Sequence, residues 1–94
     1  MTYRTKDGHA DYCFNFEEQS DGIWRAYIVT QPTYRGLPDG PHETHRLTAD
    51  DGRHYVCWTE PLQNLGEAQR VAEHWADETQ AYVKGLPAFQ EHET

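Results

Sequence analysis

The chain has 94 residues, which suffices for one small domain, and its 36% of hydrophobic residues is low for a globular protein. Its 13% of aromatic residues is nevertheless too high for a disordered chain, so we expect a single domain, residues 1–94, with a small aromatic core. The net charge is −8, from 16 acidic and 8 basic side chains. Such a charge repels phosphate backbones and anionic membranes, so we expect neither direct nucleic-acid binding nor membrane binding. The natural partner is a protein with a basic surface.

The compartment follows from what the sequence lacks. No apolar run approaches the roughly 20 residues of a membrane span, and the N-terminal stretch has no hydrophobic signal region. We therefore expect a cytoplasmic protein. Cys13 and Cys57 form no CxxC pair, so two reduced thiols are the default, and a disulfide between neighbouring strands is the alternative.

Residues 12–30 show the alternation of apolar and polar side chains that is typical of a β-hairpin. A three-residue loop at residues 20–22, with its glycine in the left-handed conformation, places Glu17 opposite Arg25 as an ion pair on one face. The same register gathers the apolar side chains on the other face: Phe14, Phe16, Trp24, Ala26 and Ile28. A two-residue turn would divide that apolar set between the two faces, so we favour the longer loop.

Residues 31–44 contain three prolines and two glycines, which argues against regular structure. A connection of this length is unusual in so small a domain, and long loops often carry function. Tyr34 and Arg35 are its candidate contact residues. The alternative is a semi-rigid crossover with a purely structural role.

Residues 45–58 predict a second hairpin, whose register depends on its turn. A two-residue turn aligns Leu47 with Val56, whereas a three-residue loop aligns Leu47 with Tyr55. We favour the two-residue turn.

Residues 64–85 have the clearest periodicity and predict an amphipathic helix. Asn64 and Glu67 have the spacing of a capping box at its start, and Gly85 supplies a left-handed residue at its end. Apolar or small side chains recur at spacings of three and four residues: Leu65, Ala68, Val71, Ala72, Trp75, Ala76, Thr79, Tyr82 and Val83. This stripe should pack on the apolar face of the first hairpin.

Thr79 is the one polar residue in the stripe, and we expect its hydroxyl to donate to the carbonyl of Trp75. The opposite side of the helix is polar and should face water. Its members are Glu67, Arg70, Glu73, His74, Asp77, Gln80 and Lys84.

These elements predict an α+β fold in which two hairpins form a four-stranded, mainly antiparallel sheet and one C-terminal helix packs on one face, in the order ββββα. We expect residues 1–11 to be a loose N-terminal arm and residues 90–94 a frayed tail. One helix covers little more than two or three strands. Part of the sheet, including Tyr27, Tyr55 or Trp58, should therefore be exposed, which would suit a homodimer or a partner protein.

The candidates for metal or thiol chemistry are His42, His45, His54 and Cys57. His42 and His45 have an HxxH spacing, but a zinc site needs three or four converging ligands, so we assign neither metal nor cofactor. In the three-residue register of the second hairpin Cys57 would lie beside His45, although buried strand cysteines are usually inert. The single serine, Ser20, falls in a predicted tight turn, and we assign no catalytic residue.

The leading hypothesis is a small, acidic, non-enzymatic binding module that docks on a partner protein, as an inhibitor, an immunity protein or a nucleic-acid mimic. Its candidate contact residues are Tyr34, Arg35, Glu67, Glu73, Asp77 and Glu78. Two alternatives remain: a small metal- or thiol-dependent enzyme that uses the histidines and cysteine around the proline-rich loop, and a structural subunit of a homo-oligomer.

Overall fold

The computed structural model describes residues 1–85, and it confirms an α+β fold with an antiparallel sheet and a long C-terminal helix. The predicted tail, residues 90–94, lies outside the described residues. The elements in chain order are β1 (Thr2–Arg4), β2 (Asp11–Glu18), β3 (Trp24–Thr30), α1 (Pro41–Thr44), β4 (Arg46–Thr48), β5 (His54–Val56) and α2 (Leu65–Val83).

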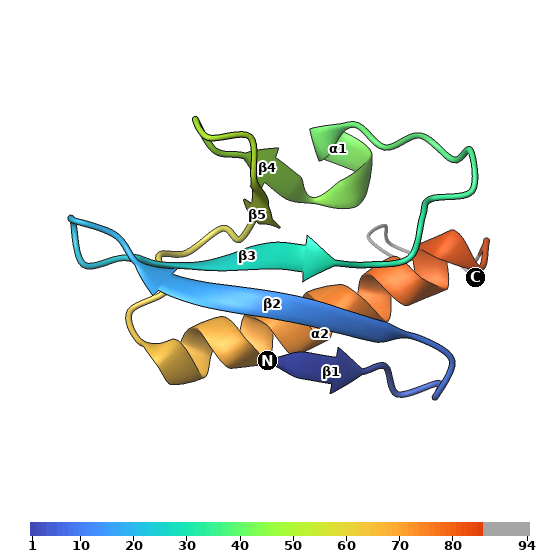
Figure 1. The fold of residues 1–94 in the computed structure, drawn as a ribbon, viewed down its shortest axis with the longest axis horizontal. Coiled ribbons are helices and arrows are strands. Elements are labelled where there is room, and N and C mark those ends of the chain that lie inside the picture. The colour runs from blue at the N-terminus through green and yellow to red at the C-terminus, as the bar shows by residue number, and fades with distance from the viewer. Residues whose placement is uncertain (86–94) are drawn as a thin grey trace.

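The sheet has five strands, where four were predicted, in the order β1-β2-β3-β5-β4. All neighbouring strands are antiparallel. Figure 1 shows α2 along one side of β1, β2 and β3, whereas β4, β5 and α1 lie beyond β3. The helix therefore covers one face of the sheet and leaves the other to side chains of the strands themselves.

The additional strand, β1, belongs to the stretch that was predicted to be a loose arm, and that prediction is wrong. Tyr3 lies opposite Tyr12 in the β1–β2 pair. The Tyr3 hydroxyl donates to Asp77 Oδ2 at 2.8 Å, and the backbone N–H of Lys6 donates to Asp77 Oδ1 at 2.9 Å. Because Asp77 lies on α2, more than 70 positions away, the sequence pattern around β1 could not show this attachment.

The first hairpin has the predicted register. Phe16 lies opposite Ala26, and Glu17 opposite Arg25. A bond from the Gln19 N–H to the Ile23 carbonyl, 2.9 Å, closes a loop of three residues, and Gly22 has a φ of 85° that favours glycine. The apolar side chains gathered by this register pack in or against the core under α2, as predicted.

The second hairpin has the three-residue register, so the favoured two-residue turn is wrong. Leu47 lies opposite Tyr55. The loop repeats that of the first hairpin, because Asp51 Oδ1 accepts from the backbone N–H of Arg53 at 3.0 Å and Gly52 has a φ of 90°. An aspartate that bonds its own backbone two residues on, followed by a left-handed glycine, stabilises the longer loop.

The proline-rich connection contains a one-turn helix, α1, where no regular structure was predicted. Pro41 is compatible with the first turn of a helix because the N–H that it lacks would have no partner there. The Thr44 hydroxyl donates to the Gly40 carbonyl at 2.8 Å, and the Trp75 indole N–H donates to the Thr44 carbonyl at 2.9 Å. Tertiary contact with α2 therefore stabilises a helix that is too short to form alone.

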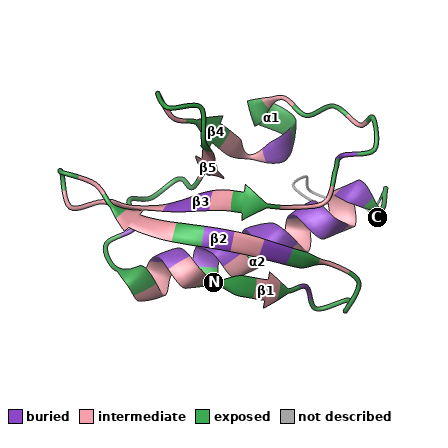
Figure 2. Cartoon of the chain, in the orientation of Figure 1, coloured by how far each residue is buried: buried purple, intermediate pink, exposed green. Residues whose placement is uncertain are grey.

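The core lies between α2 and β2, β3 and β5. The Trp75 ring meets Tyr12 and Phe14 edge to face, with centroids 5.9 and 6.1 Å apart. Three fully buried alanines on the same side of α2, Ala68, Ala72 and Ala76, let the helix approach the sheet closely. Figure 2 shows this buried stripe along α2 and on the middle of β2 and β3.

The ends of α2 follow the prediction, except that the Glu67 carboxylate bonds the backbone N–H of Gln63 and not that of the cap residue Asn64. Asn64 Oδ1 accepts from the Glu67 N–H at 2.9 Å, and Glu67 Oε1 accepts from the Gln63 N–H at 2.8 Å. Gly85 has a φ of 86° just beyond the helix. The Asn64 cap satisfies a backbone donor of the first turn that no helical carbonyl can reach.

Two expectations inside α2 are wrong. The Thr79 hydroxyl is buried without a hydrogen-bond partner, so it does not donate to the Trp75 carbonyl. Gln80, which was expected to face water, is buried and accepts from the Tyr12 hydroxyl at 3.4 Å. The burial of Gln80 shows that the buried side of α2 is wider than the apolar pattern indicated, whereas Thr79 was already part of the predicted stripe.

Two findings bear on the chain as a whole. Within residues 1–85, no helix has the length and apolar character to cross a membrane. Cys13 and Cys57 are both free thiols, which confirms the default reading of the two cysteines.

Candidate functional site

The sheet face opposite α2 is covered by arginines stacked on tyrosines. Tyr27 on β3 and Tyr55 on β5 lie side by side, with ring centroids 5.7 Å apart. The Arg53 guanidinium lies 3.8 Å from the centroid of the Tyr27 ring, and that of Arg25 lies 4.2 Å from the centroid of Tyr55. Tyr27 is consequently only 3% exposed, so the expectation that this ring is open to a partner is wrong for Tyr27.

Arg53 also ties the two hairpins together. Its Nη1 lies 2.7 Å from Glu17 Oε2, and its Nε lies 2.7 Å from Asp51 Oδ2. The hydrogen bond from the Arg53 side chain holds the pKa of Glu17 below its ordinary value, and the backbone N–H and side chain of Arg53 hold that of Asp51 below its own. The predicted ion pair of Glu17 with Arg25 is replaced by this one, and Arg25 Nη1 instead donates to the Tyr27 hydroxyl at 3.0 Å. Sequence reasoning missed Arg53 because its partners depend on how β3 and β5 are aligned.

Tyr34 and Arg35 of the proline-rich connection have different environments. Tyr34 is 8% exposed, between the Tyr82 ring, 6.0 Å away, and the Arg46 guanidinium, 5.0 Å away. Burial raises the pKa of Tyr34, against the opposite effects of neighbouring Gln31, Arg46 and Thr44. Arg35 is exposed and has a left-handed φ of 56°. Arg35 is thus the side chain of this pair that a partner can reach.

The four candidate acids of α2 divide into two pairs. Glu67 caps the helix, and Asp77 holds β1. Glu73 and Glu78 are partly exposed, and their carboxylates form no hydrogen bond or ion pair with any part of the chain that the structure describes. Glu73 and Glu78 are therefore the two that remain for a partner.

The candidates for metal or thiol chemistry lie on different segments of the described chain, residues 1–85. His42 is on α1, His54 on β5, and His45 and Cys57 are joined through their backbones, with the Cys57 N–H 2.8 Å from the His45 carbonyl. Burial and the Arg46 charge lower the pKa of His54, whose Nδ1 lies 3.1 Å from the Thr48 hydroxyl. Among residues 1–85, no three His, Cys, Asp or Glu side chains are grouped as metal ligands would be.

Trp58 is the most prominent exposed aromatic side chain of the described chain, at 45% exposure. It belongs to residues 57–64, the connection from β5 to α2, which is held against β3 by a bond of 2.9 Å from the Trp24 N–H to the Leu62 carbonyl. Its ring meets that of His74 on α2 edge to face, with centroids 5.8 Å apart. Trp58 thus lies where the sheet, the connection and the outer side of α2 meet.

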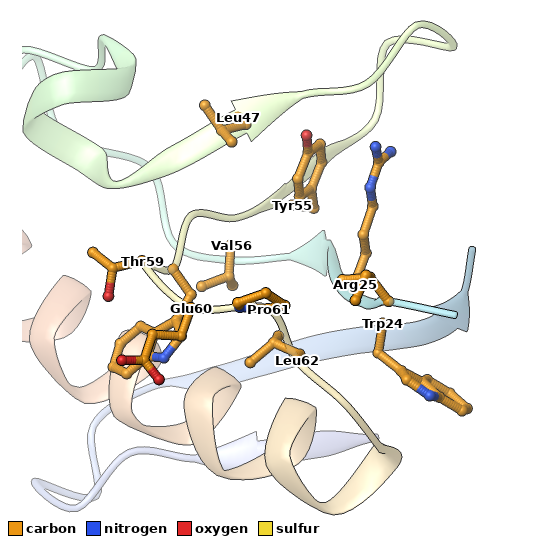
Figure 3. A pocket seen from close by; sticks show the side chains of 11 residues that line it. Trp24, Arg25, Leu47, Tyr55, Val56, Thr59, Glu60, Pro61 and Leu62 are labelled. Carbon is orange, nitrogen blue, oxygen red and sulfur yellow. The ribbon is translucent and has the colours of Figure 1, made fainter. Parts of the chain in front are cut away.

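Two hollows adjoin Trp58. The sheet-side hollow, of about 330 Å³, extends from Trp58 past Pro61, Leu62 and Val56 to Tyr55 and is mainly apolar. Figure 3 shows its labelled side chains, with Glu60 and Arg25 on different sides of it. The helix-side hollow has a similar volume, about 330 Å³, and is more polar, with Glu67 and Arg70 in its wall. Trp58, Glu60, Pro61 and Leu62 line both hollows.

Most of the basic side chains form an ion pair or stack on a tyrosine within the molecule. All eight lie in the described part of the chain, and five of them are held. Arg4, Arg53 and Lys84 are in ion pairs, and Arg25 and Arg46 are stacked on tyrosines. The excess negative charge is consequently left to the solvent.

Comparison of the sequence with protein-family models and with curated proteins gave no match, and comparison with solved structures gave none. The function of the chain is therefore inferred from its geometry and its charges.

Proposed function

We propose that this chain is a non-enzymatic binding module of the cytoplasm that docks on a partner protein with a basic surface, as an inhibitor, an immunity protein or a nucleic-acid mimic does. The observation that supports this proposal is the separation of charge. Five of the eight basic side chains are paired with carboxylates or stacked on tyrosines of the same molecule, whereas many acidic side chains have no such partner within residues 1–85.

Seven carboxylates form no hydrogen bond or ion pair with the described residues: Glu18, Asp39, Glu43, Asp50, Glu60, Glu73 and Glu78. An excess of unpaired acids accelerates encounter with a basic surface and repels acidic competitors. The mimic hypothesis rests on the same excess, because unpaired carboxylates carry the same sign of charge as nucleic-acid phosphates.

Capture from a lysate of the source cell, with the protein immobilised, tests the proposal. We expect a specific basic protein to be retained at low salt and released at high salt, because salt screens exposed charges. Replacing Glu73 and Glu78 of α2 by glutamine should weaken the capture. The matched control changes Glu18→Gln and Asp50→Asn at the hairpin loops, which removes the same charge elsewhere.

Two results would contradict the proposal. One is that no specific protein is retained at low salt. The other is a retained protein whose binding is independent of salt, since the charge excess would then have no part in it.

A further inference from the structure

The fold holds arginine side chains in one recurring way. Within residues 1–85, three guanidinium groups lie over tyrosine rings, at 3.8, 4.2 and 5.0 Å from the ring centroids. In one of them, Arg53 over Tyr27, a carboxylate at 2.7 Å binds the same guanidinium. A ring face together with a carboxylate is a good receptor for arginine, because the guanidinium stacks through its plane and donates through its edge.

Trp58 and Glu60 offer the same two groups without a guanidinium. The indole is nearly half exposed, and the contact it makes with another ring is the edge-to-face one with His74. Glu60 lies two residues further on, is exposed, and its carboxylate has no hydrogen bond or ion pair within the described chain. Indole is the strongest of the aromatic side chains in binding cations.

The sheet-side hollow suits the rest of an arginine side chain. Val56, Pro61 and Leu62 line it, and three methylene groups can pack against them while the charged head stays in water. Arg25 also lines this hollow, but its guanidinium is held over Tyr55 and bonded to the Tyr27 hydroxyl. In the helix-side hollow Arg70 has no ion pair within residues 1–85 and would repel a second cation.

We propose that Trp58 and Glu60 bind an arginine side chain of the basic partner, with the sheet-side hollow receiving its methylene groups. This inference rests on the proposed function and deepens it, because it names the side chain that the docking surface selects. It also links the site to the acidic side of α2, since His74, which contacts Trp58, lies one turn before Glu78. Trp and Arg are the residues that most often dominate the energetics of protein interfaces.

A titration followed by NMR tests the proposal with a defined probe, acetyl-tetra-arginine amide. We expect the indole N–H signal of Trp58 to shift with saturation, and those of Trp24 and Trp75 to shift much less. The equivalent citrulline peptide, which is neutral but of the same shape, should leave Trp58 unmoved. The equivalent lysine peptide should bind more weakly, because an ammonium group lacks the plane and the fork of a guanidinium.

Variants separate this site from general attraction to an acidic protein. We expect Trp58→Ala and Glu60→Gln each to weaken peptide binding, Trp58→Ala by about fivefold. Glu18→Gln removes the same charge as Glu60→Gln from an exposed carboxylate on another part of the surface and should have little effect. Trp58→Leu keeps an apolar side chain in the hollow, so an equal loss in Trp58→Leu assigns the effect to the ring and not to misfolding.

The proposal is overturned if the peptide binds Trp58→Ala as it binds the unaltered protein, if Glu18→Gln weakens binding as much as Glu60→Gln, or if Trp58 does not respond to arginine. These failures are distinct from failure of the proposed function. Salt-sensitive capture of a basic protein that is unaffected by Trp58→Ala would retain the function and reject this site. Arginine binding at Trp58 without any captured protein would retain this site and reject the proposed function.

Discussion

Thr44 and Thr79 show that the effect of a buried hydroxyl group on stability depends on whether it has a hydrogen-bond partner. Both threonines are fully buried. The Thr44 hydroxyl donates to the Gly40 carbonyl at 2.8 Å, whereas that of Thr79 has no partner. A buried polar group without a partner costs free energy, and a bonded one contributes about 1 kcal/mol to stability.

We therefore expect valine to have opposite effects at the two positions. Thr79→Val replaces an unpaired hydroxyl by a methyl group of the same shape and should raise the free energy of unfolding by about 1 kcal/mol. Thr44→Val removes a bonded hydroxyl and should lower it by about the same amount. Chemical denaturation of both variants measures the difference. A Thr79→Val protein that is less stable than the unaltered one would mean that the hydroxyl has a partner after all.

At the scale of elements, β1 and α2 depend on each other. Asp77 accepts from the Tyr3 hydroxyl and from the backbone of Lys6. Burial, the hydrogen bond to Asp77 and the charges of Asp77 and Glu73 together raise the pKa of Tyr3 to about 12. The neutral phenol is therefore the form that the folded state prefers.

This preference predicts an alkaline loss of stability. Because the pKa of Tyr3 is higher in the folded state than its ordinary value of 10.0, its contribution is complete below pH 10 and is lost as the pH rises toward 12. Asp77→Ala should lower the pKa of Tyr3 and speed hydrogen exchange in β1. Ultraviolet titration of the phenols and amide exchange measure the two effects. Asp11→Ala, which breaks the ion pair between β1 and β2, is the control that should leave the Tyr3 titration unchanged.

At the scale of the whole molecule, Arg53 joins the two halves of the sheet. Tyr27 of β3 lies opposite Tyr55 of β5. Arg53, in the second hairpin, adds contacts to Tyr27 and Glu17 of the first hairpin. Short pairing of this kind needs support from side chains. Arg53 provides this support, because its guanidinium stacks on one ring and pairs with two carboxylates.

We expect Arg53→Ala to lower the midpoint of thermal unfolding more than Arg4→Ala does. Each variant removes one cation, but Arg4 pairs with Asp11 alone, whereas loss of Arg53 uncovers Tyr27 and leaves Glu17 and Asp51 without a counter-ion. Arg53→Lys should fall between the two, because lysine keeps the charge without the planar fork. Equal effects of Arg53→Ala and Arg4→Ala would show that the hairpins are joined by backbone pairing alone.

Much of the fold was predictable because it depends on neighbours in sequence. The register of the first hairpin follows from a face of alternating apolar side chains, and the limits of α2 follow from Asn64, Glu67 and Gly85. The second hairpin has only three residues in each strand, with no such apolar set, so its pattern could not choose between two turns. The repeated Asp-Gly loop was the signal that could have decided it.

For the candidate site, the sequence predicted the kinds of residues better than it predicted their contacts. The net negative charge and the partial exposure of Glu73 and Glu78 could be predicted from the sequence, and Trp58 was among the aromatic residues expected to be exposed. The roles of Asp77 and Tyr34 could not, because their partners lie on elements far away in the chain. Pairs of this kind have no spacing that a sequence pattern can reveal.

The sequence by itself determined the elements and the sign of the surface charge, because periodicity, capping and composition are local or additive properties. Only the tertiary structure decided which charges remain available. Packing brings five basic side chains against carboxylates or rings and leaves Trp58 and Glu60, which has no ion pair within residues 1–85, lining the same hollow. Those pairings arise between segments joined by folding, and their energies depend on distances of a few ångströms that exist only in the folded chain.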